Sequence, residues 1–180
     1  LITEKAEHSL STNSHGELLP NLGEDVLKLV VVNRYQEAPP AIAFIRGIGL
    51  KRGAIASTVA HDSHNIIATG VSDEAIAEAV AKLMQSKGGV VAIDGEEEAS
   101  LPLPVAGLMS TSDAQTVGQG YAKADQLAKH FGATLSAPFM TLSFMALLVI
   151  PALKLSDKGL FNGEKFEFES LQGRNGGMKE

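Results

Sequence analysis

The stretch Gly53-Ala-Ile-Ala-Ser-Thr-Val-Ala-His-Asp-Ser-His-Asn-Ile-Ile-Ala-Thr-Gly70 holds two short apolar runs with five polar residues between them. Val, Ile and Thr fit the pleated, half-buried surface of a sheet, so we expect a strand on either side of the polar residues. The polar residues are His61, Asp62, Ser63, His64 and Asn65. Burying so many polar groups beside strands is unfavourable unless they pair with one another, a ligand or a metal. This pentapeptide is therefore the candidate functional site.

The composition of the chain excludes several classes of protein. The 180 residues carry a net charge of −6, and nucleic-acid-binding surfaces need clustered basic residues, so we expect no nucleic-acid partner. The chain has no cysteine, which excludes disulfides and thiolate metal sites. The longest apolar run, residues 144–151, is too short to span a bilayer, so we expect no membrane partner.

The residues before the central stretch predict two strands, and the residues after it predict a helix followed by a strand. Residues 26–33 form an almost continuous apolar run, typical of a strand buried on both faces, and residues 41–45 form a second strand. Apolar residues recur at helical spacing over residues 72–87, where Ser72 is suited to the N-cap. Residues 90–93 are predicted to form the next strand.

The last third of the chain predicts two more helices and two more strands. Ser112 and Gln115 match a capping box, which predicts a helix over about residues 113–131. Pro138 is suited to the first turn of a short buried helix. Residues 153–160 are typical of a strand that ends in a turn, and the alternation in residues 165–170 predicts an edge strand.

These elements together predict an α/β fold, with α+β as the alternative: one domain built on a mixed sheet of about six strands with helices packed on it. Residues 1–24 show little apolar periodicity and are interpreted as a tail or a junction, and residues 25–170 as the domain. Residues 171–180 are expected to form a disordered tail.

Several stretches, in order and correctly spaced, resemble the C-terminal domain of microbial adenine deaminase, a member of the amidohydrolase superfamily. They include Gly49-Leu-Lys-Arg-Gly-Ala-Ile-Ala-Ser57, His61-Asp-Ser-His-Asn65, Leu101-Pro-Leu-Pro-Val-Ala-Gly-Leu-Met-Ser110 and Pro138-Phe-Met-Thr-Leu-Ser-Phe144. The match continues through Val149-Ile-Pro151 and Leu153-Lys-Leu-Ser-Asp-Lys-Gly-Leu160, and it covers roughly residues 25–162.

The resemblance implies an enzyme that hydrolyses adenine to hypoxanthine and ammonia in purine salvage, in the cytoplasm and as a homo-oligomer. In such enzymes a (β/α)₈ barrel carries the divalent metal, Mn or Fe, and that barrel is absent from these 180 residues. We therefore expect adenine and the barrel domain as partners, no catalytic residue in this chain, and no activity from the chain alone.

Three interpretations of residues 61–65 remain open. As a continuous strand, the segment would form a lip over the active site of the barrel and bind adenine through His61, Asp62, Ser63, His64 and Asn65. As a tight turn, it would bring His61 and His64 together with Asp62 as a metal site of its own. Alternatively, the turn is purely structural. The rival function is a non-catalytic structural or oligomerisation module, and a further alternative is a stand-alone small-molecule-binding domain.

Overall fold

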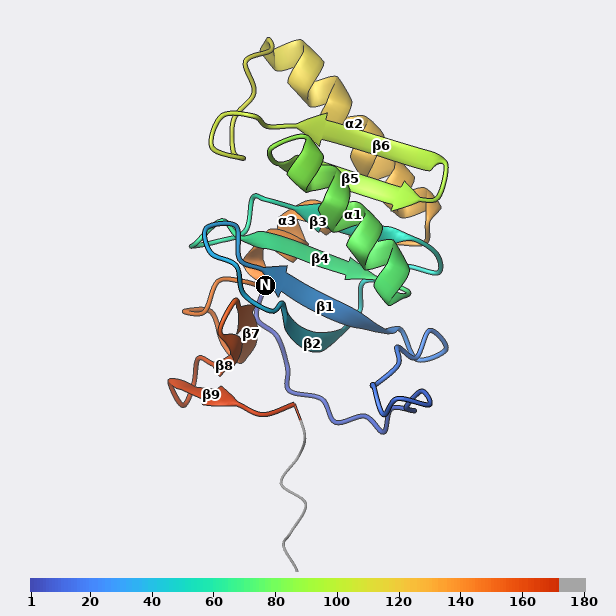
Figure 1. The fold of residues 1–180 in the computed structure, drawn as a ribbon, viewed down its shortest axis with the longest axis vertical. Helices are drawn as coiled ribbons and strands as arrows, with labels where there is room; N and C mark the ends of the chain where they lie inside the picture. The colour runs from blue at the N-terminus through green and yellow to red at the C-terminus, as the bar shows by residue number, and fades with distance from the viewer. Residues whose placement is uncertain (172–180) are drawn as a thin grey trace, which may run out of the picture.

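A computed structural model describes residues 1–171, and a six-stranded sheet runs through its middle (Figure 1). The strands stand in the order β2–β1–β4–β3–β5–β6. In chain order they span Val26–Val32 (β1), Ala41–Arg46 (β2), Ala54–Ser57 (β3), Ile66–Gly70 (β4), Gly89–Asp94 (β5) and Glu97–Pro102 (β6). The predicted strand number and the α/β class are confirmed.

The strand directions differ from the mixed sheet that we expected, because every pairing in the sheet is antiparallel. A helix between two strands can produce a parallel pair. Helix α1 (Asp73–Gln85) does connect β4 to β5, which run in the same direction. However, β3 lies between them and pairs antiparallel with both. The crossover therefore produces no parallel neighbours.

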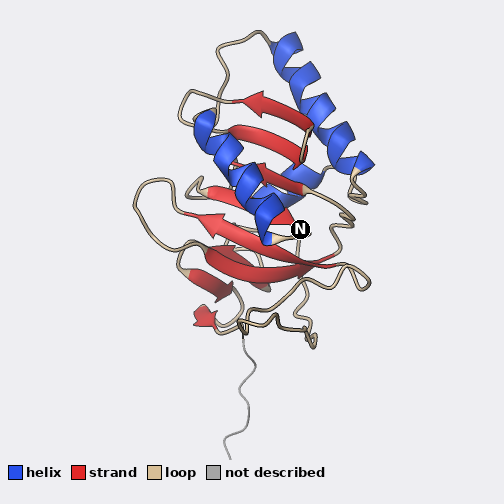
Figure 2. Cartoon of the chain, turned by 45° about the vertical axis from the view of Figure 1, so that its right-hand side comes forward, coloured by secondary structure: helices blue, strands red, loops and turns tan. Residues whose placement is uncertain are grey.

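Both faces of this sheet are covered (Figure 2). Helix α1 packs on one face, against Val30, Ala56 and Ala68. Helices α2 (Ala114–His130) and α3 (Pro138–Phe144) pack on the other face, where Leu29 and Val31 point. Because successive residues of a strand point to opposite faces, the continuous apolar run of β1 supplies both cores.

The helices lie close to their predicted positions. Ser72 caps α1 by accepting a hydrogen bond from the backbone N–H of Ala75, and α3 begins at Pro138, as expected. The N-cap of α2 is Asp113 instead of Ser112, because the Asp113 carboxylate accepts the backbone N–H of Thr116 at 2.9 Å. Within residues 1–171, no helix is long and apolar enough to cross a membrane.

A second, three-stranded antiparallel sheet is formed by β7 (Leu153–Ser156), β8 (Gly159–Asn162) and β9 (Glu167–Glu169). The strand predicted to end in a turn over residues 153–160 is β7 with its turn, after which the chain continues into β8, and the predicted edge strand is β9. Residues 1–24 form only isolated bridges, and Thr3 is hydrogen-bonded to the loop before β7. Of the expected tail at residues 171–180, only Leu171 lies within the described residues.

Candidate functional site

Residues 61–65 lie in the connection between β3 and β4, and we call this segment the 61–65 loop. It is a turn, so the continuous-strand interpretation of its geometry is wrong. Two backbone hydrogen bonds fix its ends: the N–H of His61 donates to the carbonyl of Ser143 in α3 (3.1 Å), and the N–H of His64 donates to the carbonyl of Ala60 (2.7 Å). The loop is therefore attached to α3, which packs on the face of the sheet opposite α1.

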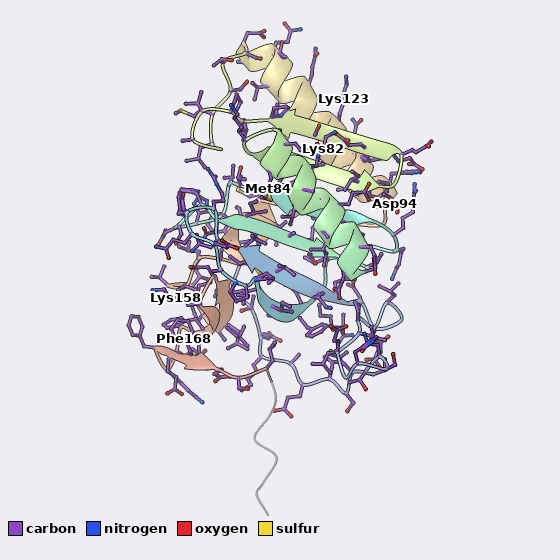
Figure 3. All side chains as sticks on the ribbon, in the orientation of Figure 1. Lys82, Met84, Asp94, Lys123, Lys158 and Phe168 are labelled. Atoms are coloured by element: carbon purple, nitrogen blue, oxygen red, sulfur yellow. The ribbon has the colours of Figure 1, made fainter. Side chains whose placement is uncertain are left out.

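The 61–65 loop borders a pocket of about 340 Å³. His61, Asp62, Ser63 and Asn65 line one part of it. The other lining residues include six from the second sheet, its turns and the loop after α3: Leu148, Val149, Ser156, Asp157, Phe161 and Phe166. In Figure 3 the label of Lys158 marks the β7–β8 turn that carries Asp157. The volume lies in the range typical of small-molecule sites, and mostly apolar walls with a few polar groups are typical of them too.

His64 is the predicted site residue that does not line the pocket. Its ring packs edge-on against the ring of His61, with 5.6 Å between the centroids, and its backbone lies in the left-handed region at φ 52°. Within the described residues, its buried Nδ1 has no hydrogen-bond partner. Burial lowers the pKa of His64, and the nearby His61 and Arg34 lower it further. Its imidazole is therefore neutral at neutral pH.

The residues after β1, for which the sequence indicated no role, hold the 61–65 loop in place. The backbone N–H of Arg34 donates to Oδ1 of Asn65 (3.1 Å), and its guanidinium donates to the carbonyls of His64 (3.1 Å) and Ala106 (2.9 Å). The hydroxyl of Tyr35 donates to the carbonyl of Ser63 (2.9 Å). The pairing of Val32 with Ile66 places these residues beside the loop, and local sequence patterns do not reveal such a pairing.

Asp157 is a second site residue that the sequence analysis missed. It lies in the β7–β8 turn, lines the pocket and accepts a hydrogen bond from Nδ2 of Asn33 (2.8 Å). An aspartate in a turn is ordinary, so nothing in the local pattern distinguished it. With Asp62, it gives the pocket two carboxylates that can accept hydrogen bonds from N–H groups of a ligand.

The sequence of the chain matches a known protein family. The sequence matches the family described as "Adenine deaminase C-terminal domain" over residues 1–167. The chain belongs to this family.

Similar curated proteins carry the name adenine deaminase. The chain is 54% identical over 169 residues to the adenine deaminase of Sulfurovum sp. (strain NBC37-1), which covers 93% of the chain and 32% of that protein. It is 51% identical over 165 residues to that of Methanosarcina barkeri, with 92% and 30% covered, and 46% identical over 170 residues to that of Brucella abortus, with 93% and 29% covered. The chain thus spans about a third of the length of these relatives.

Within residues 1–171, the histidine and acidic side chains of this adenine deaminase C-terminal domain form no metal site. No group of three or more His, Cys, Asp or Glu side chains within residues 1–171 is arranged to hold a metal ion. His61 and His64 contact each other edge-on, and only His61 lines the pocket. The interpretation of the loop as an independent metal site is therefore not supported.

Proposed function

We propose that this chain is the C-terminal domain of an adenine deaminase that hydrolyses adenine to hypoxanthine and ammonia, and that the 61–65 loop contributes to the pocket for adenine. The observation that carries the proposal is the pocket of about 340 Å³, which is lined by His61, Asp62, Ser63 and Asn65 in a member of this family. The names of the relatives support the substrate.

The chemistry of the pocket is complementary to a purine. Adenine has flat apolar faces, ring nitrogens that accept hydrogen bonds and an exocyclic amine that donates them. The Ser63 hydroxyl can donate to a ring nitrogen, and the carboxylates of Asp62 and Asp157 can accept from the amine. The rings of Phe161 and Phe166, which also line the pocket, offer apolar surface for the purine. In this proposal the domain binds and orients adenine and excludes water.

The reaction itself is assigned to a barrel domain that precedes residue 25, with residues 1–24 as the junction. When bound there, a divalent metal, Mn or Fe, would supply the nucleophilic hydroxide. The proposal further places the enzyme in purine salvage, in the cytoplasm and as a homo-oligomer. It is supported by the family match and by the greater length of the relatives.

The test uses Asp62→Asn and Ser63→Ala in the full-length enzyme, because both side chains are exposed in the pocket and neither has a structural partner described above. We expect each change to raise the KM for adenine about tenfold through the loss of one ligand hydrogen bond, with the metal content unchanged. Glu96→Gln is the matched control, because Glu96 is an exposed acid in the turn between β5 and β6.

Unchanged KM and kcat in both pocket variants would contradict the proposal. If the same variants altered the assembly state while turnover stayed normal, the domain would be the structural or oligomerisation module considered above.

A further inference from the structure

Exposed apolar side chains from four separate loops gather on the edge of the molecule that carries the pocket. They are Tyr35 (64% exposed), Met109 (57%), Val149 (72%) and Phe166 (79%), and we call them the apolar rim. In Figure 1 the loops that follow β1, β3 and β6, and those around β7 and β8, all lie on the left, whereas the β5–β6 turn lies on the right.

Contacts tie the apolar rim to the 61–65 loop. Val149 and Phe166 line the same pocket as that loop, and Tyr35 donates its hydroxyl to the carbonyl of Ser63. Met109 bridges to Val105, next to the carbonyl of Ala106 that Arg34 holds. Two residues of the apolar rim therefore line the pocket, and Tyr35 contacts the loop that borders it.

Phe166 is held in a conformation that a bulky side chain rarely adopts. Its φ is 57°, in the left-handed region, and its ring packs against Phe161 with 5.3 Å between the centroids while 79% of the residue stays exposed. Left-handed backbone is unfavourable for a large side chain, and such strain is concentrated at functional sites. Single exposed apolar residues are common, whereas exposed apolar residues that lie together mark interaction surfaces.

We infer that the apolar rim is the surface on which the preceding domain of the same polypeptide docks, so that the pocket opens towards that domain. This inference rests on the proposed function. The relatives are about three times as long as the matched region, so each contains a further part that this domain can contact.

The path of the chain supports the same occupant. The N–H of Thr3 donates to the carbonyl of Pro151 (3.1 Å), and the N–H of Ala152 donates to the carbonyl of Thr3 (3.2 Å). The backbone at Thr3 therefore lies beside the segment that carries Val149, one of the rim residues. Aromatic and apolar residues surrounded by polar ones are typical of the centre of such interfaces.

The test is thiol labelling of the full-length enzyme with single cysteines placed in this domain, whose sequence contains no native cysteine. Val149→Cys, Phe166→Cys and Met109→Cys report on the rim, and Glu96→Cys is the exposed control on the opposite edge. We expect the rim cysteines to react at least about tenfold more slowly than the control, because the centre of an interface excludes solvent. In urea all four should react alike.

Equal labelling rates at the rim and at residue 96 in the folded enzyme would overturn the inference. Protection that disappears when the enzyme is diluted to a monomer would also overturn it, because a second copy would then be the occupant. The kinetics of Asp62→Asn separate the two proposals. A raised KM together with an accessible rim would contradict only the docking surface. A protected rim with unchanged kinetics would contradict only the contact with adenine.

Discussion

The backbone of His64 lies in the left-handed region. Its ring nitrogen Nδ1 is buried and, within residues 1–171, has no hydrogen-bond partner. Desolvation is the main cause of its lowered pKa. An unfolded chain therefore takes up a proton at His64 at a higher pH than the folded chain does. Protonation thus favours unfolding, and the contribution of His64 to stability is complete above the ordinary histidine pKa and declines below it.

At the residue scale, we expect His64→Asn to weaken the dependence of stability on pH. Asn tolerates a left-handed backbone and does not titrate. As the pH falls from 7.5 through about 6.5 towards 5, the free energy of unfolding should decrease less in the variant than in the original protein. Urea unfolding followed by circular dichroism measures the free energy of unfolding of the variant and of the original protein. His15→Asn, at an exposed histidine, is the control, and parallel pH profiles for His64→Asn and the original protein would refute the expectation.

At the scale of elements, two serines precede helices and only one of them acts as a cap. Ser72 accepts the N–H of Ala75 at 3.2 Å, whereas at α2 the carboxylate of Asp113 takes that place and leaves Ser112 exposed. We expect Ser72→Ala to lower the free energy of unfolding by about 1 kcal/mol. Ser112→Ala should change it by less than about 0.5 kcal/mol. Chemical denaturation compares the two variants, and equal losses would show that Ser112 also supports its helix.

At the scale of the whole molecule, an ion pair joins the first residues to the last strand. The carboxylate of Glu169 in β9 accepts hydrogen bonds from Nζ of Lys5 (2.8 Å) and Nδ2 of Asn162 (2.7 Å). The hydrogen bond from Lys5 is the largest cause that lowers the pKa of Glu169, to about 2. Because this folded-state pKa lies below that of an unfolded glutamate, the stabilisation is present above the unfolded value and is lost as the pH falls towards 2.

We therefore expect Glu169→Gln to lower the thermal unfolding midpoint at pH 7 and to have a much smaller effect near pH 2, where the original carboxylate takes up its proton and most of the pH-dependent stabilisation is lost. Calorimetry at the two pH values measures the difference. Glu167→Gln is the matched control, since its carboxylate is mostly exposed and lies 4.0 Å from Lys165. An equal loss at both pH values would indicate that Glu169 acts by packing rather than by its charge.

The parts of the fold that were predictable depend on neighbouring residues. The limits of α1 follow from Ser72 and from apolar residues at helical spacing, and β1 follows from a continuous apolar run, so both were located within a few residues. The 61–65 loop was also found, because its five polar residues interrupt two apolar runs. Asp157 was missed because its partner Asn33 lies 124 residues away in the sequence, a distance over which no local pattern extends.

The sequence by itself determined where strands and helices form and which loop gathers polar chemistry, because periodicity, caps and chain breakers act over a few residues. The tertiary structure alone decided that every strand pairing in the two sheets is antiparallel, that His64 does not line the pocket, and that Asp157 and Phe166, in turns of the second sheet, do. The physical reason is that strand pairing and pocket closure result from burying both faces of one sheet. That burial brings together residues that are far apart in the sequence.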